Sequence, residues 1–356
     1  MIRVCLEPRG ASTAAVRWTG FGVAIGVAGA AGAGVFLLAG ANPATAYAVM
    51  AEGAFGSLHD LSEVVVKSIP LMLCGLAVAA AARIQLWNVG GEGQLVLGGV
   101  GAAGVALFLS PSLAPGIVLP LMVAAGFAMG GVWGLVAGFL KARLDVSEIL
   151  ASLMLNYVAI FWLEHLYFGP WRDPRGMGFP GTAMLPDVAW LSRFPGTRIH
   201  LGLVFALVAA GLFQGLLSRT RWGFEIRVIG ESPRAAKYAG IPVRRMMLWV
   251  MFASGGLAGL AGMAEVSGIH YRLQQGLAVG YGYTGIIVAW LGRLHPLGIL
   301  LAAFGIAALL VGGDQLQAVM HLPAAAGLVL EGTLFFSVLA GEIVSRYRIR
   351  WRTSVP

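Results

Sequence analysis

The amino-acid sequence predicts an all-α fold: a polytopic integral membrane helical bundle with about ten transmembrane helices, some of them broken or short. Of its 356 residues, 58% are hydrophobic and 11% are charged, whereas a soluble domain has about 25% charged residues. The apolar residues recur in runs of about 20, the length that a helix needs to cross roughly 30 Å of hydrocarbon. The 52 glycines are typical of closely packed and interrupted helices in a membrane.

Each predicted span is an apolar run between helix breakers. The spans cover residues 18–41, 61–82, 92–109, 115–140, 147–168, 200–218, 246–267, 278–292, 296–312 and 324–345. The first run is too long for the apolar core of a signal peptide and further spans follow it, so we expect it to be retained. The eighth run is short and rich in glycine. The eighth and ninth runs therefore form either two full spans or a re-entrant pair, and both arrangements put the two termini on the same side.

The positions of the cations predict on which side the termini lie. Most of the 24 Lys and Arg residues fall in the tails and in alternate loops, and cytoplasmic loops are the ones that carry such an excess. We therefore expect a cytoplasmic N-terminal tail at 1–17, a single transmembrane domain at 18–345 and a basic cytoplasmic C-terminal tail at 346–356. Loop 219–245 is then cytoplasmic, and loop 169–199 lies outside.

Motifs of the common enzyme classes are absent or lack their context. GYGYTG at 280–285 matches a dinucleotide fingerprint, but no strand precedes it and no acidic residue follows at the required distance; we expect an unwound or tightly packed helix instead. No lysine follows a glycine, so the chain has no phosphate-binding loop with which to hydrolyse ATP. The six histidines and two cysteines form no metal or hydrolase pattern. The chain is not expected to be an enzyme.

Polar residues within the predicted spans are the candidates for a substrate pathway, because such residues are costly in a membrane and usually face a bundle interior or a cavity. In VGGEGQ, the glycines at 90, 91 and 93 weaken the helix around Glu92, as in the discontinuous helices where transporters bind substrate. The alternative is structural: Glu92 pairs with a neighbouring helix, or caps the third span as an acid in its first turn. The candidate pathway residues are Asn88, Glu92, Gln94, Asn156, Tyr157 and Thr284.

Structural interpretations compete for the other polar residues. A single asparagine such as Asn156 is at least as often a hydrogen-bonding link between helices as a ligand group. Glu164 lies near an aromatic interface, Glu265 near the outer end of the seventh span and Glu331 within the tenth.

Loop 219–245 contains the signals of a short helix. Ser232 is a capping residue and Pro233 fits the first helical position, while Gly240 and Pro242 end the helix. The segment PRAAKYA combines small residues with cations, which favours a protein partner that approaches closely. A basic helix lying on anionic lipid is the alternative.

Four segments resemble one known family, in order and in spacing: RVIGESPRAAKYAGI, LWNVGGEGQLVLGG, SEILASLMLNYVAIFWLEHLYFGPWRDP and GYGYTGIIVAWLGRLHPLGILLAA. They look like permease subunits of ABC importers, in the nucleoside and simple-sugar branch of the branched-chain amino acid and ribose type. The resemblance runs from about Leu61 to Arg346. One departure is Glu331, where relatives often carry an uncharged glutamine.

The resemblance implies a transport subunit in a bacterial cytoplasmic (inner) membrane. Its implied partners are a second, homologous permease, one or more ATPase subunits that carry ATP and magnesium, and an extracytoplasmic solute-binding protein. The chain itself would hold no cofactor and bind no nucleic acid. The implied ATPase contact consists of Ser232, Pro233, Arg234, Ala235, Ala236, Tyr238 and Gly240.

The resemblance also favours a solute. The forms MLNY and GPWRDP resemble the nucleoside type more than the type that carries free pentoses, so a nucleoside comes first and a simple sugar next. The alternative function is a proton-coupled secondary transporter, in which Glu92, Glu265 or Glu331 carries the proton. A membrane scaffold is a third possibility, in which the polar residues only pack helices.

Overall fold

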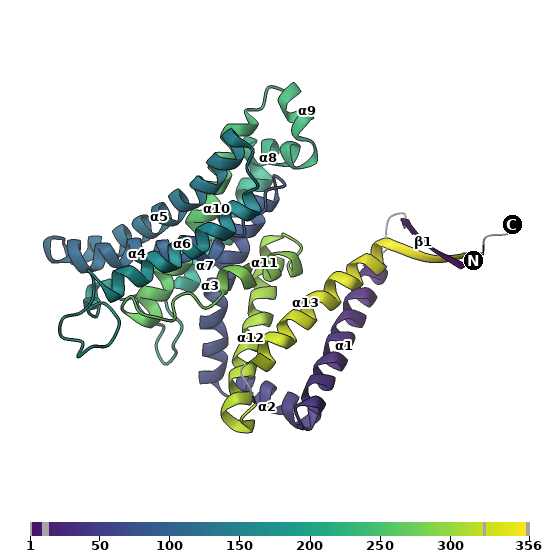
Figure 1. Ribbon diagram of the computed structural model, residues 1–356, viewed down its shortest axis with the longest axis horizontal. Coiled ribbons are helices and arrows are strands. Elements are labelled where there is room, and N and C mark those ends of the chain that lie inside the picture. The colour runs from purple at the N-terminus through teal and green to yellow at the C-terminus, as the bar shows by residue number, and fades with distance from the viewer. Residues whose placement is uncertain (1, 9–13, 323–324, 354–356) are drawn as a thin grey trace. The chain divides into compact units, whose positions relative to one another are not determined.

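The computed structural model describes residues 2–8, 14–322 and 325–353 of the chain (Figure 1). These residues divide into two compact units. One unit comprises Ser62–Ala307, and the other comprises Met1–Leu61 together with Ala308–Pro356. The polar residues singled out in the sequence lie in the first of these units, apart from Glu331.

The unit 62–307 is built from helices joined by short connections and one long loop. Its elements are α3 (Leu58–Ala82, from residue 62), α4 (Gly91–Gly104), the π-helix η1 (Val105–Leu109), η2 (Ser110–Ser112), α5 (Pro115–Leu144), α6 (Glu148–Phe168), η3 (Asp187–Ala189), α7 (Gly202–Arg219), α8 (Arg221–Glu231), α9 (Pro233–Tyr238), α10 (Val243–Glu265), the π-helix η4 (Val266–His270), α11 (Tyr281–Leu291) and α12 (Pro296–Met320, to residue 307).

Helices α4, α5 and α10 lie side by side and form the centre of this unit (Figure 1). Glycines let their backbones touch. A Cβ atom placed on Gly98 of α4 would lie 2.2 Å from the Cα of Gly259 in α10, and one on Gly130 of α5 would lie 2.6 Å from the same atom. Much of the glycine excess is therefore used for close helix packing.

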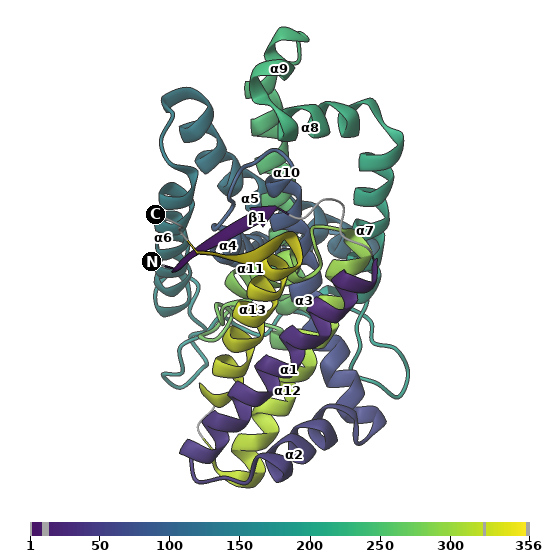
Figure 2. The ribbon, with the colours of Figure 1, turned by 90° about the vertical axis from the view of Figure 1, so that its right-hand side faces the viewer.

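The other unit pairs the two ends of the chain. Helix α1 (Ala14–Leu38) packs along α13 (Ala325–Arg346) (Figure 2). Strand β1 (Ile2–Pro8) pairs antiparallel with β2 (Tyr347–Thr353), with Cys5 opposite Arg350. This two-stranded ladder was not predicted.

Helix α2 (Pro43–Phe55) was also not predicted. Asn42 caps it by accepting a hydrogen bond from the backbone N–H of Ala44, and Pro43 occupies its first turn. The segments Gly22–Leu38 and Pro43–Phe55 meet at 111°, so the chain turns sharply after its first apolar run.

The prediction of a polytopic helical bundle is confirmed, and every predicted span overlaps a helix. The number of about ten spans is not confirmed. Within the described residues, seven helices are long and apolar enough to cross a membrane, or eight if the bent α1–α2 pair forms one span. Helix α11 has 11 residues and is too short to cross.

The predicted single domain 18–345 stays a prediction. The predicted tails 1–17 and 346–356 include residues 1, 9–13 and 354–356, which lie outside the described part of the chain.

Candidate functional site

Glu92 lies in the first turn of α4, but it caps a different helix. Its Oε1 accepts a hydrogen bond of 2.7 Å from the backbone N–H of Gly280, and its Oε2 accepts one of 2.7 Å from that of Gly282. These two N–H groups belong to the start of α11, where no helical carbonyl can accept them. The carboxylate is 1% exposed. Glu92 therefore joins α4 to α11 inside the bundle.

The GYGYTG segment provides the other half of this joint. Gly280 has φ +98°, a conformation that favours glycine. A Cβ on Gly282 would lie 2.1 Å from the backbone nitrogen of Glu92, and one on Gly285 would lie 2.7 Å from the Cβ of Cys74 in α3. The three glycines of the apparent dinucleotide fingerprint thus serve a tight turn and two close helix contacts, as a tightly packed helix requires.

Asn156 links three segments around the joint. From α6, its Oδ1 accepts from the backbone N–H of Gly93 at 2.9 Å. Its Nδ2 donates to the carbonyl of Val89 at 2.9 Å and to the hydroxyl of Tyr283 in α11 at 3.1 Å. Sequence reasoning missed Tyr283, although it stands next to the predicted Thr284.

Asn88 and Gln94 form a second buried group beside the first. The Asn88 Nδ2 donates to the Gln94 Oε1 and to the Ser254 Oγ, each at 2.8 Å, and the Gln94 Nε2 donates back to the Asn88 Oδ1 at 2.9 Å. Ser254 of α10 donates in turn to the carbonyl of Ala77 in α3 at 2.6 Å. Ser254 was not a predicted site residue. The feature that could have identified it is its position as a polar residue within a glycine-rich apolar span.

The structure therefore brings together four of the six predicted pathway residues. Asn88, Glu92, Gln94 and Asn156 are all buried and hydrogen-bonded within the protein. The side chain of Tyr157 is 50% exposed, on a different face of α6 from Asn156, and Thr284 is half-buried. Contact of any of the six with a solute stays a prediction.

Two of the three remaining acids are buried. Glu265 is buried, with its Oε2 3.8 Å from the Nε2 of His270, and Glu331 is buried in α13. Glu164 is half-buried. The part of the chain that the structure describes holds no group of three or more His, Cys, Asp or Glu residues that could bind a metal ion.

Helix α9 forms where the sequence predicted a short helix. The Ser232 Oγ accepts from the backbone N–H of Ala235 at 3.2 Å, and Pro233 is the first helical residue. Gly240, at φ +76°, ends the helix: its N–H donates to the carbonyl of Lys237, and that of Ile241 donates to the carbonyl of Ala236. This pair of bonds is a Schellman motif, so both ends of α9 are fixed.

One face of α9 is anchored and the other is presented to the surroundings. Ala236 is fully buried in an apolar cluster with Ile226 and Ile229 of α8 and Met246 of α10. Arg234, Ala235 and Lys237 are exposed, and Tyr238 is 95% exposed. Figure 2 shows α8 and α9 at one end of the unit. The helix is thus a rigid, cationic projection.

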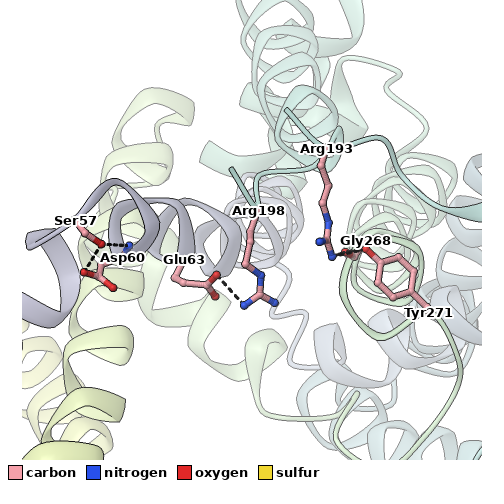
Figure 3. A network of polar contacts seen from close by, with 7 residues as sticks. All are labelled: Ser57, Asp60, Glu63, Arg193, Arg198, Gly268 and Tyr271. Atoms are coloured by element: carbon pink, nitrogen blue, oxygen red, sulfur yellow. Dashed lines mark hydrogen bonds and ion pairs between the residues drawn. The ribbon is translucent and has the colours of Figure 1, made fainter. Parts of the chain in front are cut away.

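Loop 169–199 is ordered at the opposite end of α10. The backbone N–H of Leu191 donates to the carbonyl of Ser267, and Arg193 donates to the Tyr271 hydroxyl and to the Gly268 carbonyl (Figure 3). Arg198 forms an ion pair of 2.9 Å with Glu63 of α3. The loop is therefore bound to η4, which follows α10, and to α3.

His200 closes this loop and is fully buried. Its Nδ1 accepts from the backbone N–H of Gly202 at 3.1 Å, and its ring packs against Gly268. Burial, together with the nearby charge of Arg193, lowers the pKa of His200 to about 4. The ring is therefore neutral at physiological pH.

Comparison with known proteins assigns the chain to a family. The model of the branched-chain amino acid transport system permease component matches residues 61–339. The chain belongs to this permease family. The permease is 33% identical to the glucose ABC transporter permease protein of Haloferax volcanii, over 98% of this chain and 94% of the relative. It is 33% identical to the guanosine ABC transporter permease protein of Bacillus subtilis, over 90% and 91%.

A third relative is the nucleoside ABC transporter permease protein of Lactococcus lactis. The permease is 30% identical to it, over 86% of both chains. The resemblance seen in the four sequence segments is thereby confirmed at the level of the family. With its apolar helices, the permease is a multi-pass membrane protein.

Proposed function

We propose that the permease is the transmembrane subunit of an ABC importer. It translocates a small polar solute that a solute-binding protein delivers, and a separate ATPase subunit, which holds ATP and magnesium, supplies the energy. A second, homologous permease completes the membrane part. The family and the names of the relatives support this assembly.

The observation that carries the proposal is the geometry of α9. Capping at both ends and the burial of Ala236 hold the helix rigid, while its cations and Tyr238 remain exposed. A rigid helix can transmit a displacement that a flexible loop would absorb. We assign Ser232 to Gly240 as the segment that docks on the ATPase.

The solute is proposed to be a nucleoside, with a simple sugar as the next candidate. Two of the relatives are named for guanosine or nucleoside transport and one for glucose. Thermal-shift screening of the cognate solute-binding protein against nucleosides, bases and sugars separates these classes. Stabilisation by sugars alone would contradict the nucleoside assignment.

The orientation follows from the ATPase contact. We place α9 and both termini in the cytoplasm and loop 169–199 outside, in a bacterial inner membrane. The excess of Lys and Arg on the α9 side supports this orientation. In membranes that contain the permease without the ATPase, Tyr238→Cys in a Cys5→Ser background should react with a membrane-impermeant thiol reagent in inside-out vesicles and not in intact cells.

Ala235→Glu tests the docking assignment. Ala235 is exposed, so the variant should fold, but the longer, charged side chain should separate α9 from the ATPase. We expect solute-dependent ATP hydrolysis and uptake to be lost in the reconstituted importer. Ala114→Glu changes an exposed alanine before α5 and serves as the control. Normal assembly and uptake in Ala235→Glu would contradict the assignment.

An ionophore separates this function from proton-coupled transport. If uptake collapses with the proton gradient while ATP stays high, the permease is a secondary transporter. The structure offers that alternative little support at Glu92, because both carboxylate oxygens are engaged by backbone N–H groups.

A further inference from the structure

Helix α11 contacts the connection between α3 and α4, and the first turn of α4, at both of its ends. At its start, Glu92 accepts the hydrogen bonds of Gly280 and Gly282. Near its end, the ring of Trp290 stacks on that of Trp87, with centroids 5.4 Å apart. The contacts therefore join segment 83–92 to both ends of a helix about 190 residues away in sequence.

The turn that follows α11 is held by the same segment. The Arg83 Nη2 donates to the carbonyl of Leu294 at 2.7 Å. Arg293 and Leu294 have φ values of 54° and 56°, a conformation that residues with side chains seldom adopt. The carbonyl that Arg83 binds thus belongs to a turn in the left-handed backbone conformation.

Segment 83–92 is also in direct contact with α8, the helix that precedes α9. The Gln85 Nε2 donates to the carbonyl of Gly230 at 2.6 Å. A Cβ placed on Gly230 would lie 2.1 Å from the carbonyl oxygen of Arg83, so the two backbones touch here. The Gln85 bond keeps this contact closed, so Arg83 follows a displacement of α8 in either direction.

We infer that Arg83 and Gln85 are positioning residues that transmit the movement of the α8–α9 segment to α11, and that α11 is the element of the pathway that the ATPase moves. The inference rests on the proposed function. The force passes from Gly230 to Gln85 and Arg83, and from Arg83 to Leu294 at the end of α11. Glu92 and Trp87 keep α11 against this segment, and the Arg83 bond fixes the turn through which the displacement enters α11.

The contacts explain why this route is favoured over the α9–α10 connection. Beyond α9, the chain continues into α10, whose backbone is in close contact with α4 and α5 through Gly98, Gly130 and Gly259. Packed helices of this kind resist displacement. Helix α11 is also closely packed, but segment 83–92 contacts both of its ends and the turn that follows it, so a displacement of this segment carries α11 with it.

Two variants remove the two links. Gln85→Asn keeps a residue that tolerates the φ of 60° at this position, but its shorter side chain does not reach Gly230. Arg83→Met keeps the apolar stem and removes the donor to Leu294. Gln275→Asn, at an exposed glutamine in another loop, is the matched control.

The measurement is uptake per ATP hydrolysed by the complete importer in proteoliposomes. In both variants we expect assembly and solute-independent ATP hydrolysis to match the wild type, whereas the thermal midpoint of Arg83→Met should fall slightly, because the partly buried Leu294 carbonyl loses its donor. Uptake per ATP should fall at least about fivefold, the lower end of typical coupling between two sites. Because the two links act in series, uptake per ATP in the double variant should equal that of the more impaired single variant.

Two results would overturn the inference. Wild-type uptake per ATP in both single variants excludes transmission through these residues, and losses that multiply in the double variant exclude a single route. These failures differ from failure of the proposed function, in which the wild-type importer itself shows no solute-dependent ATP hydrolysis.

Discussion

The α4–α11 joint and helix α9 both stand out in the sequence because polar residues lie beside glycines. The two regions differ in what these polar residues contact. At the joint, Glu92, Asn88, Gln94 and Asn156 are buried and bound to other parts of the protein. On α9, the cations and Tyr238 are exposed. The polar groups of the first region are bound within the protein, and those of the second are accessible at its surface.

This difference predicts how the two regions respond to mutation. A buried group that loses its partner leaves another polar group unsatisfied, and the free energy of unfolding falls. An exposed group on a rigid helix can be removed with little effect on stability. Changes at the joint should therefore destabilise the permease, whereas changes on α9 should leave it folded and impair its assembly or coupling.

The largest effect is expected for Glu92→Ala. Two buried N–H groups of α11 lose a charged acceptor, and hydrogen bonds to charged groups contribute about 1.5–3 kcal/mol each. We expect the free energy of unfolding to fall by about 3 kcal/mol or more, measured as a lower thermal midpoint in detergent. Glu92→Gln keeps one acceptor oxygen and should lie between Glu92→Ala and the wild type.

Glu52→Gln provides the control for this experiment, since Glu52 is exposed. If Glu92→Ala proves as stable as this control, the carboxylate does not hold α11 in place. Transport that survives in Glu92→Gln and fails in Glu92→Ala would show that hydrogen bonding matters and charge does not.

A smaller loss is expected for Gly282→Ala. The added methyl group would lie 2.1 Å from the Glu92 nitrogen, so α4 and α11 must separate. Overpacking of this kind typically costs about 1–3 kcal/mol, which calorimetry or a thermal-shift assay can measure. Gly211→Ala in α7 is the control, because a Cβ there meets nothing within 4 Å. Equal midpoints for the two variants would exclude a tight contact at the joint.

The pH dependence of stability tests the buried loop contact at His200. The pKa of this ring is about 4 in the folded chain, against an ordinary value of 6.5. The stabilising contribution is complete above pH 6.5 and is lost as the pH falls toward 4, because the unfolded chain takes up the proton first. Between about pH 7.5 and about pH 5.5, we expect a loss of about 1 kcal/mol.

His200→Gln should flatten this dependence, since the Gln side chain offers an oxygen acceptor and does not titrate. Thermal midpoints measured across the pH range would check the prediction. An unchanged pH profile in the variant would assign the dependence to other groups.

The smallest effect on stability is expected for Tyr238→Ala. Because this side chain is 95% exposed, the free energy of unfolding should change by less than about 0.5 kcal/mol. Solute-stimulated ATP hydrolysis of the assembled importer should nevertheless fall by about fivefold or more, since interface tyrosines often contribute over about 1 kcal/mol to binding. Full stimulation in the variant would remove Tyr238 from the docking surface.

Local sequence signals located the long helices and α9, but not α2 or α8. Apolar runs located every long helix, and Ser232, Pro233 and Gly240 defined the short one, because capping depends on neighbours in sequence. Asn42 and Pro43 gave an equally local signal for α2, but the long apolar run before it concealed a second helix.

The partner of Glu92 could not be predicted in the same way. Sequence reasoning left three alternatives for Glu92: a pathway residue, a pair with a neighbouring helix, or a cap for its own helix. The carboxylate binds a neighbouring helix, α11, which the sequence could not single out because it begins far away in the chain. Tyr283 and Ser254 were missed for the same reason, because their partners are Asn156 and Asn88. Contacts between distant segments leave no periodic pattern in a single sequence.

The bond between Glu92 and α11 also has an electrical consequence. A helix that begins inside a bundle carries a partial positive charge of about half a unit at its start, which ordinarily attracts anions. Here the permease's own carboxylate occupies that position. The field at the start of α11 is therefore balanced within the protein, and the two N–H groups that would bind an anion there are already occupied.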